Sequence, residues 1–232
     1  MSTLLKLTLA LLGSVFITHM AHATIAIDDT PWPPEQPQIQ GRSLAALPVD
    51  KRPVFVHAFI HDDVKESQSA IYAEHFLPMV KEIKAFNGRP VSIQFIRNQG
   101  SYTDYAYKNE DEQAAFRHWN KLALQYRDEK NLPYARTTKF LLITKDDLSS
   151  RVGGIAGVGQ QTGIASLKRN LNVGHELGHM LDAAHEHSDV LYRGGWWCDT
   201  YMVPSPNLLT SNCHVYTDAN REKINDFLKN VP

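Results

Sequence analysis

The sequence predicts an α+β domain in which a twisted mixed sheet of about five strands packs against long helices. Two observations carry this prediction. Apolar patterns of strand period and helix period alternate between residues 50 and 170. The chain left after removal of an N-terminal leader, roughly 210 residues, suits one domain with or without a small lobe. We also expect a metal-bearing helix and a small C-terminal subdomain with one helix.

Residues 1–23 have the features of a secretory signal peptide. Lys6 supplies the positive n-region, and the apolar run from Leu7 to Ile17 is too short to span a bilayer comfortably. Ala21-His22-Ala23 is a small-x-small cleavage signature. We expect cleavage after Ala23 and a secreted protein, extracellular or periplasmic, with no further membrane span. The alternative is an uncleaved membrane anchor.

Residues 24–48 are irregular, because the prolines between positions 31 and 37 exclude a regular helix or a central strand. This segment is either a flexible leader or a short latency propeptide that covers the active site, and the sequence leaves both open. Residues 49–232 then form the folded domain, with an upper lobe at 49–184 and a lower lobe at 185–232.

The elements of the domain follow in order. Residues 53–61 alternate with large side chains on both faces, which predicts a strand covered on both sides. Helical spacing follows at 69–86, with a kink expected at Pro78. A strand is predicted at 91–96. Asn109 and Glu112 form a possible capping box for a helix that ends near Lys130. A third strand follows at 139–144.

The glycine-rich stretch 153–159 is not a phosphate loop, because no Gly-Lys-Ser/Thr follows it. We interpret Gly154, Ile155, Ala156 and Gly157 as an edge strand beside another strand at 164–167. Such an edge could accept an extended substrate peptide by strand addition. An ordinary glycine-rich loop is the equal alternative.

Charge and cysteine content limit the partners. The formal net charge is −1 and no Lys/Arg cluster stands out, which argues against nucleic acid and against an anionic membrane. We expect a monomer. Cys198 and Cys213 predict a disulfide closing a loop of about fifteen residues. The alternative is a pair of thiolate zinc ligands.

The chemistry lies in His175-Glu176-Leu177-Gly178-His179, followed by His185. Two histidines four apart on a helix lie on one face and can bind one ion, and Glu176 is placed to accept a proton from metal-bound water. His185 adds a third ligand and leaves one position free for water. The pattern predicts one catalytic Zn²⁺ ion and hydrolysis, most often of peptides.

These residues, with Met202 downstream, resemble the metzincin zinc endopeptidases, and the cysteine-containing stretch and closing helix resemble the reprolysin-type branch and its bacterial secreted relatives. The resemblance implies a zincin-like fold, a loop bearing Met202 beneath the metal, and a secreted zinc metalloendopeptidase. Asp182 stands where that family usually has glycine. We expect it to adopt a left-handed conformation. Pro204 excludes a tyrosine fifth ligand.

Two alternatives remain. One is a thermolysin-like site in which Glu222 replaces His185 as third ligand. The other is a catalytically silent, secreted binding module on a peptidase fold, against which the intact Glu176 argues. Trp196-Trp197 and Tyr201 either line a specificity pocket or pack in the core.

Overall fold

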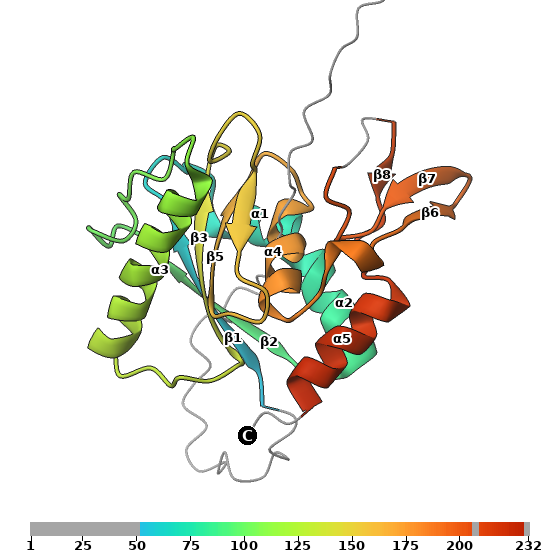
Figure 1. Ribbon diagram of the computed structural model, residues 1–232, viewed down its shortest axis with the longest axis horizontal. Coiled ribbons are helices and arrows are strands. Elements are labelled where there is room, and N and C mark those ends of the chain that lie inside the picture. Colours follow the sequence, from blue (N-terminus) through green and yellow to red (C-terminus); the bar gives the residue numbers. More distant parts are fainter. Residues whose placement is uncertain (1–51, 206–208, 230–232) are drawn as a thin grey trace, which may run out of the picture.

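A five-stranded sheet lies at the centre of the computed structural model, which describes residues 52–205 and 209–229 (Figure 1). The predicted signal peptide and leader lie outside these residues. The strand order is β2-β1-β3-β5-β4, and β4 alone runs antiparallel to its neighbour within this sheet. The predicted mixed sheet is therefore confirmed. Its elements are β1 (Val54–Ile60), α1 (Gln68–Ile71), the π-helical segment η3 (Tyr72–Phe76), α2 (Leu77–Asn87), β2 (Val91–Ile96), α3 (Glu112–Glu129), β3 (Thr138–Thr144), β4 (Gly154–Ala156), β5 (Thr162–Ser166) and α4 (Asn172–Met180).

Helices cover both faces of the sheet, as the two-sided apolar pattern of the first strand predicts. On one face, Val56 and Ala58 of β1 belong to a core that α2, α4 and α5 (Asp218–Lys229) complete. On the other face, Phe59 packs against Trp119 of α3, with ring centroids 5.2 Å apart. All four of these side chains are fully buried. Figure 1 shows α3 apart from the other long helices, across the sheet.

The helical stretch 68–87 is not one regular helix with a simple kink. It changes to π-helical geometry at Tyr72–Phe76 and resumes as α2, where Pro78 occupies the first turn. Proline has no N–H to donate, so the preceding turn cannot complete the usual series of backbone hydrogen bonds between residues four apart. The wider turn compensates, because the Leu77 N–H donates to the Tyr72 carbonyl. The predicted disturbance at Pro78 is present, one turn earlier than the proline itself.

The predicted capping box of α3 is wrong in detail. Asp111 is the N-cap, and its carboxylate accepts a hydrogen bond from the Ala114 N–H at 2.9 Å. Asn109 instead accepts from the Asp111 N–H, also at 2.9 Å, and so forms the turn that leads into the cap. Glu112 is the first helical residue and contacts Ser149 and Arg151. Short polar side chains compete for neighbouring caps, which periodicity alone does not resolve.

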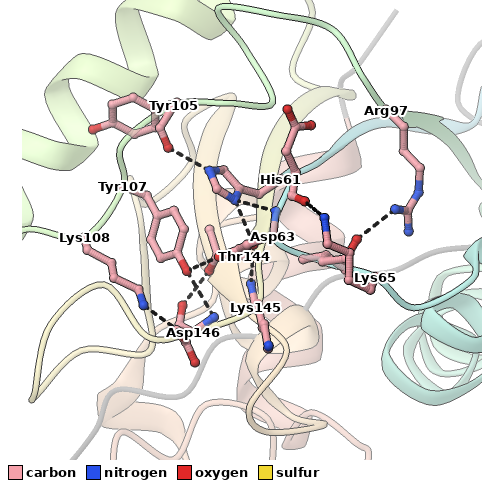
Figure 2. A network of polar contacts seen from close by, with 12 residues as sticks. His61, Asp63, Lys65, Arg97, Tyr105, Tyr107, Lys108, Thr144, Lys145 and Asp146 are labelled. Atoms are coloured by element: carbon pink, nitrogen blue, oxygen red, sulfur yellow. Dashed lines mark hydrogen bonds and ion pairs between the residues drawn. The ribbon is translucent and has the colours of Figure 1, made fainter.

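A polar network fastens the loop before α3 to the ends of β1 and β3 (Figure 2). His61 donates through Nε2 to the Tyr105 carbonyl at 2.9 Å. The Tyr107 hydroxyl donates to Asp63 at 2.6 Å, and Lys108 donates to Asp146 at 2.6 Å. Burial and the hydrogen bond to Asp63 raise the pKa of Tyr107 above its usual range, so this hydroxyl stays a donor.

The chain after the metal helix forms a smaller sheet. It follows the 3-10 turn η4 (His185–His187) and contains β6 (Val190–Arg193), β7 (Trp196–Asp199) and β8 (Ser211–Asn212), in that order. Cys198 of β7 and Cys213 form a disulfide, so thiolate zinc ligands are excluded. Helix α5 then returns against α2. Within the described residues, we find no helix with the length and apolar character needed to cross a membrane.

Candidate metal centre

Helix α4 carries the first two predicted ligands and is buried along its whole length. Two glycines allow this close packing. A Cβ on Gly174 would approach the Tyr201 ring to 2.5 Å, and one on Gly178 would approach Met202 Sδ to 2.5 Å. Any larger residue would force the partner to move. The turn that carries Tyr201 and Met202 therefore lies directly against α4, beneath the face that bears the histidines.

The three predicted histidines converge. His175 Nε2 lies 3.0 Å from His179 Nε2 and 2.7 Å from His185 Nε2, and the last two nitrogens are 2.9 Å apart. Within the described chain, these residues form the one group of at least three side chains that could hold a metal ion. The donor set contains no carboxylate. Glu222 is exposed on α5, so the thermolysin-like alternative is not supported.

Backbone carbonyls fix the tautomers of two of these rings. His175 Nδ1 faces the Tyr201 carbonyl at 2.7 Å, and His179 Nδ1 faces the Ala183 carbonyl at 3.1 Å. A carbonyl can only accept, so each Nδ1 carries the proton and each Nε2 presents a lone pair. Burial lowers the pKa of His175 well below its usual range, and burial together with His185 lowers the pKa of His179 to about 4. Both rings are therefore neutral at neutral pH.

When neutral rings direct their lone pairs at one point, only a cation bound between them can satisfy all of these lone pairs. His175 and His179 cannot hydrogen-bond to each other through Nε2, and His185 could donate to only one of them. Two nitrogens bound to tetrahedral zinc at 2.0–2.1 Å lie about 3.3–3.4 Å apart, slightly further than the 2.7–3.0 Å found here. A small outward movement accommodates the ion. The donor set fits Zn²⁺.

The end of α4 turns the chain so that His185 can reach the other two rings. The Ala183 N–H donates to the Gly178 carbonyl and the Asp182 N–H donates to the His179 carbonyl, which together make a Schellman motif. Asp182 occupies its left-handed position, with φ of 76°, as we expected from the sequence. The helix therefore ends at Met180.

Asn220 of α5 holds the segment between this turn and His185, and the sequence alone did not identify it. Its Oδ1 accepts from the Ala184 N–H at 2.8 Å, and its Nδ2 donates to the Ala184 carbonyl at 3.1 Å. Asn220 is fully buried. Thr217 caps α5 and also donates to the His187 carbonyl at 2.6 Å. The N-terminus of the last helix thus fixes the backbone on both sides of the third ligand.

Lys139 supports the other end of the same turn, and it too was missed. This lysine lies in the central strand β3 with no exposed surface, and its ammonium donates to the Met180 and Gln160 carbonyls. The Gly159 N–H donates to the His179 carbonyl at 2.8 Å, so the loop after β4 also contacts the end of α4. Burial lowers the pKa of Lys139 to about 7. A cation at a helix C-terminus is favourable, which offsets part of the desolvation cost.

Glu176 is buried beside the ligands, and its Oε2 has no hydrogen-bond partner among the described residues. Burial raises the pKa of Glu176 well above its usual range. A buried, unpaired carboxyl oxygen is costly unless a substrate, ion or water uses it. Glu176 is therefore a buried carboxyl group, next in sequence to His175, whose Oε2 no described residue satisfies.

Comparison with solved structures gives the fold. The chain aligns with metalloproteinase-II from Bacteroides fragilis at a TM-score of 0.56 and 14% identity, over 89% of this chain. It covers 57% of the length of that protein. A zinc-dependent peptidase from Methanocorpusculum labreanum aligns at a TM-score of 0.43 and 17% identity, over 73% of this chain and 100% of its own. No protein-family model and no curated protein sequence matches.

The chain shares its fold with metalloproteinase-II. Within this fold, Met202 is fully buried in a turn that packs against Gly178 of α4. Tyr201 is also buried and packs against Gly174, so it belongs to the core rather than to a specificity pocket. Trp196 and Trp197 are exposed on the β6–β7 hairpin. The predicted edge strand is present as β4, which pairs with β5 and has no second partner among the described strands.

Proposed function

We propose that this protein is a secreted zinc-dependent endopeptidase of the metzincin type, close to the reprolysin branch. One observation carries the proposal. Three histidines bring their Nε2 atoms to one point, and Glu176, next in sequence to the first of them, has a buried carboxyl oxygen without a hydrogen-bond partner among the described residues. The fold shared with metalloproteinase-II supports the same reaction class. The disulfide and the signal-peptide pattern of residues 1–23 support export.

In this proposal His175, His179 and His185 hold the ion, and the carbonyls of Tyr201 and Ala183 keep the first two rings in the required tautomer. A zinc ion bound there supplies Lewis acidity, which activates water and polarises the scissile carbonyl. Glu176 accepts the proton that the attacking water loses and passes it to the leaving nitrogen. Its burial suits both steps, because a raised pKa lies closer to neutral pH, where the carboxylate is a stronger base for the water proton and can still release that proton to the leaving nitrogen.

Strand β4 is the proposed binding edge for substrate. Residues Gly154–Ala156 pair with β5 on one side only, within the described chain. The loop that follows reaches the end of α4 through Gly159, so a peptide added to this edge would run towards the metal ligands. Extended peptides bind such edges through backbone hydrogen bonds, which require no particular side chains. We therefore expect cleavage within chains rather than at their ends.

Replacing Glu176 with Gln tests the mechanism. The variant keeps the shape of the side chain and all three ligands, so zinc content should stay stoichiometric. Cleavage of a peptide library should fall by a factor of about 10²–10⁴, the usual contribution of a general acid–base. Glu186→Gln is the matched control, because Glu186 is an exposed acid next to His185 and has no proposed role.

Full activity in Glu176→Gln would refute the proposed proton transfer. A parent protein that binds zinc but cleaves nothing in the library would instead support the silent binding module. In addition, a chelator should abolish the peptidase activity of the parent protein, and added zinc should restore it.

A further inference from the structure

The hairpin formed by β6 and β7 exposes aromatic side chains that no part of the metal site uses. Tyr192 and Trp196 are each 61% exposed, and Trp197 is 55% exposed. The turn is Gly194-Gly195, where both residues have positive φ values of 61° and 86°. Figure 1 shows the hairpin extending away from the helices and the central sheet. Its tip is therefore accessible from several directions.

The aromatic residues lie on both faces of the hairpin. Tyr192 is directly opposite Trp197, with ring centroids 5.1 Å apart, and Arg193 is directly opposite Trp196. Residues directly opposite each other in an antiparallel pair share a face, and successive residues alternate. Trp197 and Trp196 therefore point to opposite sides. A flat partner could cover one of these faces but not both.

The size and charge of the tip narrow the choice of partner. An aromatic side chain has about 150–250 Å² to bury, so the three rings expose roughly 300–450 Å². A stable protein interface needs about 800 Å² from each partner, which argues against a second copy of this chain. Arg193 is the one charged residue between Val190 and Cys198, and no acid interrupts the segment. A phosphate-bearing surface complements this charge.

We propose that the tip of the β6–β7 hairpin inserts into the headgroup region of a lipid bilayer. Tryptophan and tyrosine favour this region, because their rings are apolar and their N–H and O–H groups still reach water or headgroups. Insertion covers both faces of the hairpin at once, and Arg193 remains at the level of the phosphates. The low net charge of the whole chain means that the rings, rather than electrostatic attraction, provide most of the binding.

The base of the hairpin is built to support such a role. The Thr200 hydroxyl donates to the Asp189 carbonyl at 2.8 Å, and the Cys198–Cys213 disulfide joins β7 to the chain after β8. A strand of four residues extends about 13 Å. Interfacial segments enter a bilayer by about 5–10 Å, so the tip can insert while the base stays outside. The inference does not depend on the proposed peptidase activity.

The test uses the exported full chain and vesicles of zwitterionic phosphatidylcholine. Co-flotation with vesicles measures partitioning, and quenching by brominated acyl chains measures the depth of the indoles. We expect binding with a blue shift in tryptophan emission. Trp196→Ser with Trp197→Ser should lower the partition coefficient at least tenfold and remove the quenching. Tyr134→Ser is the matched control, because Tyr134 is an 83% exposed aromatic residue outside the hairpin and should change nothing.

Unfolding curves establish that the double variant is folded, and Tyr192→Ser gives a second, milder test of the same surface. The inference is overturned if the parent chain does not bind at high lipid excess, or if the double variant binds equally well. It is also overturned if sedimentation equilibrium shows a dimer that the tryptophan replacements abolish while vesicles have no effect. That result would identify a second copy as the occupant.

Discussion

Replacing Asp182 tests how the chain brings its third ligand to the metal. Asp182 has φ of 76° in the motif that ends α4. A residue with a Cβ loses about 1–2 kcal/mol in this conformation, and Asp reduces the loss because its short polar side chain can hydrogen-bond locally. Alanine pays this steric cost without a side-chain hydrogen bond that could offset it. Glycine has no Cβ and therefore no steric cost in this conformation. The three substitutions Asp182→Ala, Asp182→Gly and Asp182→Asn therefore separate conformation from charge.

The magnitudes follow from the contacts of Asp182. Its carboxylate lies 3.3 Å from the Lys223 ammonium, and both groups are partly exposed, so this ion pair contributes about 0.2–1 kcal/mol. Asp182→Asn should lose only that. Asp182→Ala should lose the ion pair and the local compensation, about 1–2 kcal/mol together. Asp182→Gly should lose the ion pair and a further amount of about 0.4–1 kcal/mol, because glycine gives the unfolded chain more conformational freedom. It also removes the steric cost of the left-handed conformation, so its free energy of unfolding should stay close to that of the parent.

Urea unfolding of the chelator-treated protein measures these differences in free energy without a contribution from bound metal. In thermal unfolding, 1 kcal/mol corresponds to about 2–4 °C in Tm for a domain of this size. Competition with a chromophoric chelator measures zinc affinity in the same variants, which should fall for Asp182→Ala and remain unchanged for Asp182→Gly. Equal stability of the alanine and glycine variants would refute a left-handed residue at 182 and our account of how His185 reaches the metal.

Three further results are expected. Asn220→Ala should weaken zinc binding about tenfold, because Ala184 loses both of the hydrogen bonds that fix it. Competition with a chelator measures the zinc affinity, and Asn225→Ala, on the same helix, is the control. Burial lowers the pKa of Lys139 from 10.5 to about 7, so between about pH 7 and pH 10 the unfolded chain binds a proton that the folded chain does not, and the free energy of unfolding should rise with pH. Urea midpoints measured across this range should rise less steeply in Lys139→Met, and an unchanged slope would contradict a lowered pKa for Lys139. Removing the Cys198–Cys213 disulfide should cost about 3 kcal/mol for a loop of 15 residues, and a calorimetric loss near zero would show that the small sheet unfolds separately.

The sequence predicts those parts of this structure that depend on local patterns. Alternating apolar residues identify the strands, and four-residue spacing identifies the two ligands on α4. Asp182 could be assigned a left-handed conformation because a third ligand at His185 requires a sharp turn there. Each of these inferences uses residues within about ten positions of one another, where helix and strand geometry fix the directions of side chains.

The supports of the metal site could not be predicted in this way. Asn220 bonds to Ala184 across 36 positions of sequence, and Lys139 bonds to Met180 across 41. A lysine in an apolar strand and an asparagine in an amphipathic helix carry no signal of their own, because their partners are backbone carbonyls and N–H groups that any residue has. The cap at Asp111 failed for a different reason, since several neighbouring polar side chains could form it.

The hydrogen bonds from Asn220 to Ala184 have a consequence for biosynthesis. The residues that fix the third ligand belong to α5, which follows α4 in the chain and so leaves the ribosome after it. A nascent or C-terminally shortened polypeptide would hold two histidines on α4 but would lack the clamp that positions the third. Metal capture in its final geometry thus waits until α5 has been synthesised and has packed against the turn that follows α4.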